Sequence, residues 1–136
     1  MSNLQRFLDA QSRDYTCALA EIKAGQKRSH WIWYVFPQIG GLGFSEMSKR
    51  YAIRDMPEAS AYLSHPVLGK RLIEISAALL ELESSNATKV MGSPDDMKLR
   101  SSMTLFSLVP GADPVFEAVL KKFFGGKKDQ GTLQQL

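Results

Sequence analysis

The chain has 136 residues, a formal net charge of +3 at pH 7 and 44% hydrophobic side chains. This composition excludes a disordered, collagen-like or low-complexity chain, and the length supports one hydrophobic core with about 7,100 Å² of accessible surface after folding. A single cysteine excludes an internal disulfide, and the longest uncharged apolar stretch, residues 31–37, is too short to span a bilayer. We therefore expect a soluble, cytoplasmic protein in which residues 1–136 form a single all-helical domain.

The first 25 residues carry the pattern of two helices. Leu4 begins a short amphipathic helix, and Ser12 is positioned to cap a second helix whose apolar residues recur at helical spacing. Gly25 follows the last periodic residue, where helices commonly end in a left-handed glycine. We therefore predict one helix on each side of Ser12.

Residues 30–36 combine the length of a strand with aromatic and β-branched side chains. No other segment shows the period-two alternation of a partner strand, and a lone buried strand would leave its backbone groups unpaired. We therefore predict a short helix here, capped by Ser29 and ended by Pro37. Residues 38–43 contain three glycines and are predicted to form a tight loop.

The second half of the chain shows helix-start signals ahead of apolar periodicity. Asp55 and Glu58 have the spacing of a capping box. Pro66 precedes the clearest apolar stripe, whose members lie three or four residues apart. Because only short connections separate these helix-start and helix-end signals, the sequence predicts an all-α fold of roughly six to eight helices. The stripe is Leu68, Leu72, Ile75, Leu79 and Leu82; Ser93-Pro94 and Asp113-Pro114 mark further starts, and Gly125-Gly126 marks an end.

Residues 27–38 hold both tryptophans of the chain beside basic and polar side chains. Trp31 and Trp33 offer flat surfaces on which the base of a nucleotide could stack. Lys27 would then hold a phosphate, and Gln38 would hydrogen-bond a sugar. The alternative is that these aromatic side chains form the centre of a small helical core.

Residues 95–106 form the second unusual segment. They place Lys98, Ser101 and Ser102 on one helical face, although serine is a poor residue for a helix interior. This face could present an ammonium and two hydroxyls to an anionic or sugar-like ligand. Alternatively, the hydroxyls permit close helix packing and bond to the backbone carbonyls four residues earlier.

Two residues are candidates for acid–base catalysis, and one arginine for anion binding. His30 and Asp96 could exchange protons with a ligand; the alternatives are a structural imidazole and a first-turn acid favoured by the helix dipole. Arg50 could hold a phosphate. It would form an anion fork with Arg54 if the helix that begins at Ser45 continues through both positions.

A basic group near the C-terminus offers another function class. Residues 121–128 contain no acidic side chain and four basic ones: Lys121, Lys122, Lys127 and Lys128. This group of lysines could bind nucleic acid. Alternatively, it could suit the end of a helix, where positive charges interact favourably with the helix dipole. The sequence has no phosphate-binding loop, zinc signature, nucleophile elbow or dinucleotide-binding turn. We therefore expect no metal site and no cofactor.

Seven short motifs are spread over almost the whole chain: Lys27-Arg28-Ser29-His30-Trp31, Phe36-Pro37-Gln38, Gly41-Leu42-Gly43, Arg50-Tyr51-Ala52-Ile53, Ala61-Tyr62-Leu63, His65-Pro66-Val67-Leu68-Gly69 and Ser101-Ser102-Met103-Thr104-Leu105-Phe106. Together they resemble the bacterial family known as domain of unknown function 1810. This resemblance implies a mainly helical, single-domain protein and no established activity. At the level of fold, the pattern is also similar to the helical family that cleaves N-glycosidic bonds of ADP-ribose-linked compounds. No catalytic residue of that second family can be assigned to a position here.

Two hypotheses of function follow from these residues. The first is a small protein that binds or hydrolyses a nucleotide-like, ADP-ribose-type ligand, with hydrolytic or N-glycosidic cleavage as its most concrete reaction. The second is a non-catalytic interaction module that binds protein or nucleic acid through its basic faces. The sequence predicts no membrane partner, and it leaves the oligomeric state open.

Overall fold

Residues 3–136 are described by a computed structural model, and they contain nine α-helices and no strand. The all-α prediction is confirmed, but the number of helices exceeds the six to eight expected. Four helices have only four to six residues, and such short segments do not show a helical period in the sequence. The helices are α1 (Gln5–Lys23), α2 (Ile32–Val35), α3 (Glu46–Arg50), α4 (Met56–Ser64), α5 (Leu68–Leu80), α6 (Ala87–Met91), α7 (Asp95–Ser107), α8 (Val115–Phe124) and α9 (Gln130–Gln135).

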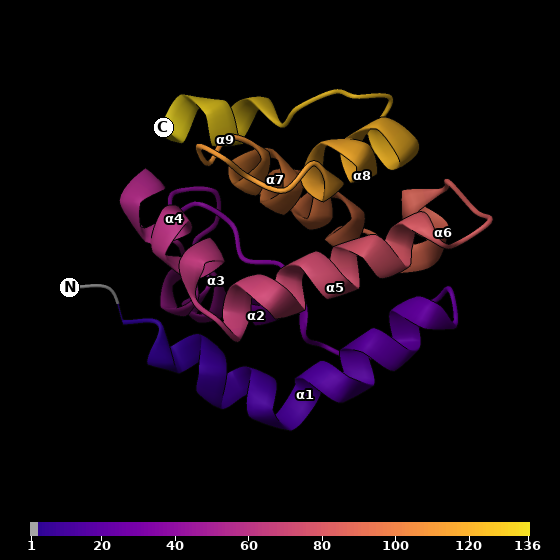
Figure 1. Cartoon of the computed structure of the whole chain (residues 1–136), viewed down its shortest axis with the longest axis horizontal. Helices are drawn as coiled ribbons and strands as arrows, with labels where there is room; N and C mark the ends of the chain where they lie inside the picture. Colours follow the sequence, from indigo (N-terminus) through magenta and orange to yellow (C-terminus); the bar gives the residue numbers. More distant parts are fainter. Residues whose placement is uncertain (1–2) are drawn as a thin grey trace.

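Helix α5 crosses the centre of the molecule, with α1 on one side and α7 and α8 on the other (Figure 1). The buried hydrophobic side chains form one cluster that includes Leu68, Leu72, Ile75 and Leu79 of the predicted stripe. The fifth member, Leu82, lies beyond the end of α5 and is only partly buried. Aromatic rings connect its parts: the Tyr62 ring lies 5.2 Å from that of Phe7 and 5.3 Å from that of Phe106. The accessible surface is 7005 Å², close to the value expected for a folded chain of this mass.

The predicted break at Ser12 is wrong, because α1 runs through it as one helix of 19 residues. Residues 5–23 contain no proline or glycine, so a serine alone does not interrupt the helix. The Ser12 hydroxyl donates to the carbonyl oxygen of Asp9 at 2.7 Å instead of capping. Gly25 ends the helix with a φ of 85°, as predicted.

Two of the predicted helix starts have caps that differ from the prediction. Asp55 caps α4 by accepting the Glu58 N–H at 3.0 Å, but the Glu58 carboxylate accepts the N–H of Arg54 rather than that of Asp55. Helix α7 begins after Pro94 without a side-chain cap, so the expected cap at Ser93 is absent. The Asp113 carboxylate does accept the Val115 N–H at 2.8 Å, at the start of α8.

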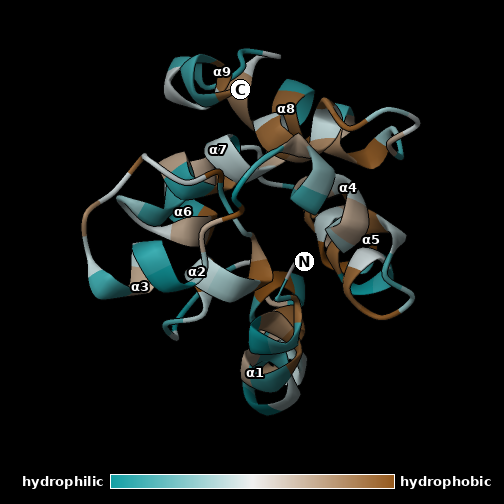
Figure 2. Cartoon of the chain, turned by 90° about the vertical axis from the view of Figure 1, so that its left-hand side faces the viewer, coloured by the Kyte–Doolittle hydropathy of each residue, from teal (hydrophilic) through white to brown (hydrophobic). Residues whose placement is uncertain are grey.

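The ambiguous segment 30–36 contains the short helix α2, which confirms the helical interpretation. Ser29 is not its cap, because its hydroxyl donates to the carboxylate of Glu21 at 2.6 Å. After Pro37 the chain forms a parallel bridge between Ile39 and Ile53. This bridge fixes the predicted glycine loop to the segment that follows α3. Figure 2 shows α2 and α3 on the opposite side of the molecule from α4 and α5.

Candidate ligand-binding site

A cavity of about 560 Å³ opens between α2, the loop 38–43, α3 and the first turns of α7. Its volume lies within the range of small-molecule sites, which is about 300–1,000 Å³. Asp129 and Gly131, at the start of α9, complete the wall. The cavity therefore joins segments that are far apart in the sequence, and it is mostly apolar with a few polar groups.

Four of the sequence-predicted ligand-binding residues line this cavity: Trp33, Gln38, Lys98 and Ser101. The ammonium of Lys98 lies 4.5 Å from the centre of the Trp33 ring, within cation–π distance. Trp33 is half-buried, and the Lys98 side chain is 21% exposed. An aromatic face and a cation thus adjoin each other on the same wall.

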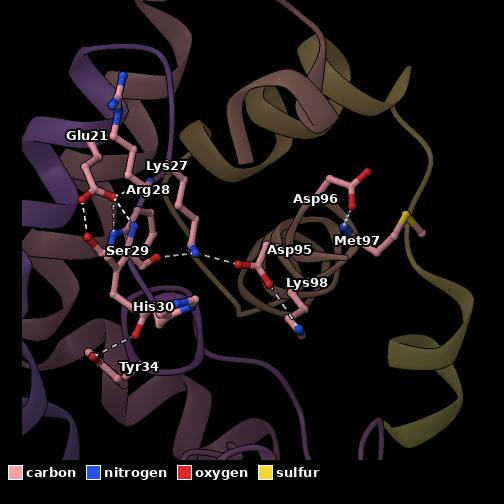
Figure 3. Close-up of polar contacts among 11 residues, drawn as sticks. Glu21, Lys27, Arg28, Ser29, His30, Tyr34, Asp95, Asp96, Met97 and Lys98 are labelled. Atoms are coloured by element: carbon pink, nitrogen blue, oxygen red, sulfur yellow. Dashed lines mark hydrogen bonds and ion pairs between the residues drawn. The ribbon is translucent and has the colours of Figure 1, made fainter. Parts of the chain in front are cut away.

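Lys98 is also part of a charged triad that connects the cavity to the loop before α2 (Figure 3). One carboxylate oxygen of Asp95 lies 3.2 Å from the Lys98 ammonium, and the other lies 2.7 Å from the ammonium of Lys27. The Lys27 side chain is only 6% exposed and also donates to the Ser29 carbonyl oxygen. Lys27 is therefore held behind the cavity wall as a buried ion-pair partner and does not line the cavity.

Gln38 and Ser101 differ in whether their side-chain donors already have a hydrogen-bond partner within the protein. The Nε2 atom of Gln38 is buried and has no hydrogen-bond partner within residues 3–136. Such unpartnered buried donors are rare, because each costs free energy. The Ser101 hydroxyl donates to the Met97 carbonyl oxygen at 3.1 Å, as the packing alternative predicted, so it can only accept a further hydrogen bond.

Trp31, Ser102 and Arg50 lie outside the cavity. Trp31 is 1% exposed and Ser102 is fully buried, so both belong to the core. For Trp31 this agrees with the alternative interpretation, in which the aromatic side chains of residues 27–38 form part of a helical core. Arg50 is exposed, and its guanidinium lies 5.5 Å from the centre of the Tyr51 ring. The predicted anion fork with Arg54 is wrong, because α3 ends at Arg50 and the two residues do not share a helix.

The two candidate acid–base residues do not line the cavity either. His30 is exposed, and its backbone carbonyl accepts the Tyr34 hydroxyl at 3.2 Å. The Asp96 carboxylate accepts the Thr88 hydroxyl at 2.7 Å and the Met97 N–H at 2.9 Å. Figure 3 shows Asp95 and Asp96 on different sides of the axis of α7, so only Asp95 reaches Lys98.

The residue that organises the aromatic run is Glu21, which sequence reasoning missed. Its carboxylate accepts the backbone N–H groups of Arg28 and Ser29 at 2.7 and 2.9 Å, and the Trp31 indole N–H at 2.9 Å. Burial alone would raise the pKa of Glu21, but these hydrogen bonds and the one from the Ser29 hydroxyl hold that pKa well below its usual range. No local sequence motif indicates this role of Glu21, because its hydrogen-bond partners lie seven to ten residues further along the chain.

Sequence reasoning also missed Tyr51 and the start of α9 as parts of the cavity wall. Arg100 fixes the segment before α9 by donating to the carbonyl oxygens of Lys127 and Lys128 at 3.0 and 2.8 Å. A Cβ on Gly131 would lie 3.2 Å from a methyl carbon of Leu42, so the helix approaches the glycine loop closely. The glycines of residues 38–43 were the one sequence signal that pointed to this close approach.

The C-terminal basic group does not form one solvated stripe. The ammonium of Lys122 donates to the carbonyl oxygens of Leu79 and Leu80 at 3.3 and 3.0 Å, at the end of α5. Lys128 lies 3.3 Å from the carboxylate of Glu117. Lys121 and Lys127 are exposed. Half of the group is thus engaged within the molecule.

The fold and the cavity define a small all-helical protein with a ligand-sized opening between its helices. The chain belongs to the family described as "Protein of unknown function (DUF1810)", which matches residues 1–136. Its structure is similar to the crystal structure of the conserved hypothetical protein Rv1873 from Mycobacterium tuberculosis, with 44% sequence identity and a TM-score of 0.95. The similarity covers 98% of this chain and 95% of that chain. No protein with a curated description matches.

These comparisons confirm the family resemblance and the helical fold, and neither description names an activity. Within residues 3–136, none of the helices has the length and apolar character required to cross a membrane.

Proposed function

We propose that this protein binds a nucleotide-like small molecule of the ADP-ribose type in the cavity beside Trp33. The observation that carries the proposal is the pairing of the Trp33 ring with the Lys98 ammonium, 4.5 Å apart on one wall. A planar base can pack against the part of the indole that Lys98 leaves uncovered, and an anionic group can pair with the ammonium. Gln38 also lines the cavity and adds an amide side chain to its wall.

Binding is a better-supported function than hydrolysis. Neither His30 nor Asp96 lines the cavity, so the acid–base groups expected for N-glycosidic cleavage are not beside the proposed ligand. Asp129 lines it, but one of its carboxylate oxygens accepts the N–H and hydroxyl of Thr132 at 2.9 and 2.6 Å. The alternative, an interaction module with basic faces, has weaker support because Lys122 and Lys128 already have partners.

Isothermal titration of the purified chain with ADP-ribose, NAD and the ribonucleoside monophosphates tests this proposal. We expect at least one of these compounds to bind, and Trp33→Leu and Lys98→Met each to weaken binding by about tenfold or more. Lys70→Met is the matched control for Lys98→Met, because Lys70 is exposed and does not line the cavity. The absence of binding to every compound, or equal effects of the two lysine variants, would contradict the proposal.

A further inference from the structure

The charged residues around the cavity indicate which charge the ligand carries, in addition to its planar shape. Lys49, Lys98 and Asp129 line the cavity, so its formal net charge is +1. Lys49 is exposed, so water and salt screen its charge. Lys98 is therefore the cation with which a partly buried anionic group would interact most strongly.

Asp95 reduces the charge that Lys98 presents to the cavity. Its carboxylate contacts both Lys27 and Lys98, so one negative charge is shared between two positive ones. The Lys27 side chain is 6% exposed and Asp95 is its carboxylate partner, so Lys27 cannot leave Asp95 without becoming a buried, unpaired charge. The triad as a whole keeps a single net positive charge, and it holds the Lys98 ammonium beside Trp33.

This inference rests on the proposed function and specifies the ligand further. We propose that the cavity selects a planar compound in which the phosphate that contacts Lys98 carries one negative charge, as each phosphate of an ADP-ribose diphosphate does, and that Asp95 determines this preference. A terminal phosphate carries close to two negative charges at pH 7, since its second pKa is about 6. Only one of these charges would be balanced by the triad, and the second would approach the Asp95 carboxylate.

The test compares the four ribonucleoside 5′-monophosphates with their methyl esters, which keep the base and sugar but carry one negative charge fewer. The wild-type chain is expected to bind the ester of its preferred base more tightly than the monophosphate, by about three- to tenfold. Asp95→Asn is expected to remove or reverse this preference, because both lysines then act without a carboxylate.

Asp96→Asn is the matched control, since Asp96 is the next residue of the same helical turn and contacts Thr88 rather than a lysine. It is expected to retain the wild-type preference. If Asp95→Asn does not fold, Lys98→Met replaces it: the Asp95 carboxylate then has only Lys27 as a partner, so both compounds should bind more weakly while the ester stays preferred. Loss of the preference for the ester in Lys98→Met would overturn the role of Asp95.

The outcomes separate this inference from the proposed function. Tighter wild-type binding of the monophosphate would overturn the charge preference while leaving nucleotide binding intact. Equal shifts in the two asparagine variants would overturn the role of Asp95. Binding of none of the eight compounds, nor of ADP-ribose or NAD, would overturn the proposed function and this inference together.

Discussion

The indole N–H of Trp31 donates to the carboxylate of Glu21 at 2.9 Å, and this bond anchors the segment before α2 to α1. Trp33, two residues further along, turns to the cavity instead. Two tryptophans in one short run thus have different roles: Trp31 holds the core together, and Trp33 provides a surface that a ligand can reach.

Replacement of Glu21 should lower the free energy of unfolding at neutral pH. It should also reduce the loss of stability that the protein shows as the pH falls. The depressed pKa of Glu21 means that its ionised form stabilises the fold above the unfolded-state pKa of about 4.3, and that this contribution is lost as the pH falls. Glu21→Gln should lower the free energy of unfolding by about 1–3 kcal/mol at pH 7. At pH 3 the difference from the wild type should be smaller.

Urea denaturation at the two pH values measures this effect, with Glu83→Gln as the control because Glu83 is exposed. A constant difference between wild type and Glu21→Gln from pH 7 to pH 3 would show that the carboxylate charge does not stabilise the fold.

The two tryptophans should differ in their contribution to stability. Trp31→Ala removes a side chain that is 1% exposed, so it should lower the free energy of unfolding by about 3–5 kcal/mol. Trp33 is half-buried, and Trp33→Ala should cost less than half as much while removing ligand binding. Thermal or urea denaturation of both variants measures the difference, and equal losses would contradict the separation of roles.

Lys122 should stabilise the end of α5, in contrast to its neighbour. Its ammonium donates to the carbonyl oxygens of Leu79, Leu80 and Leu82, at the end of α5 and just beyond it, where a helix provides few N–H partners for its carbonyl groups. Lys122→Met should lower the free energy of unfolding by about 1–2 kcal/mol. Lys121→Met, at an exposed position of the same helix, should have almost no effect, and the same chemical denaturation measures both. Similar values for both variants would rule out a specific role of Lys122.

Gly69 should not tolerate alanine, although alanine is the better helix former by about 1 kcal/mol. A Cβ on Gly69 would overlap the backbone carbonyl oxygen of Leu63, so α4 and the start of α5 would have to move apart. We expect Gly69→Ala to lower the melting temperature by several degrees, since overpacking costs about 1–3 kcal/mol. At Gly40 the added carbon would make only ordinary contacts, so Gly40→Ala should have a smaller effect. A stabilised Gly69→Ala variant would contradict this close contact.

Helices such as α5 and α8 were predictable because their apolar residues repeat over several turns. The stripe that begins at Leu68 is the clearest case, and its members from Leu68 to Leu79 are buried. The break at Ser12 shows the limit of such reasoning, since a residue that favours caps also occurs within a helix. Helices as short as α3 have too few residues to display a period.

The candidate site was predictable only in part. Trp33 and Lys98 stood out because of their residue types, yet nothing in the sequence placed them on one wall. Their neighbour Tyr51 and the turn at Asp129 come from other segments, so the cavity exists only through tertiary packing. The role of Asp95 follows from a contact with Lys27, which is 68 positions earlier in the chain. Local patterns contain no information about such a pair.

Residues 27–31 are held to the rest of the molecule by two carboxylates, those of Glu21 and Asp95. Glu21 accepts several donors of this segment at once, and Lys27 is joined to Asp95 on α7. Because one carboxylate accepts these donors, its departure releases the backbone N–H groups of Arg28 and Ser29 together. The amide hydrogens of this segment should therefore exchange with solvent in a single cooperative opening, rather than by the independent fraying that is common in surface loops.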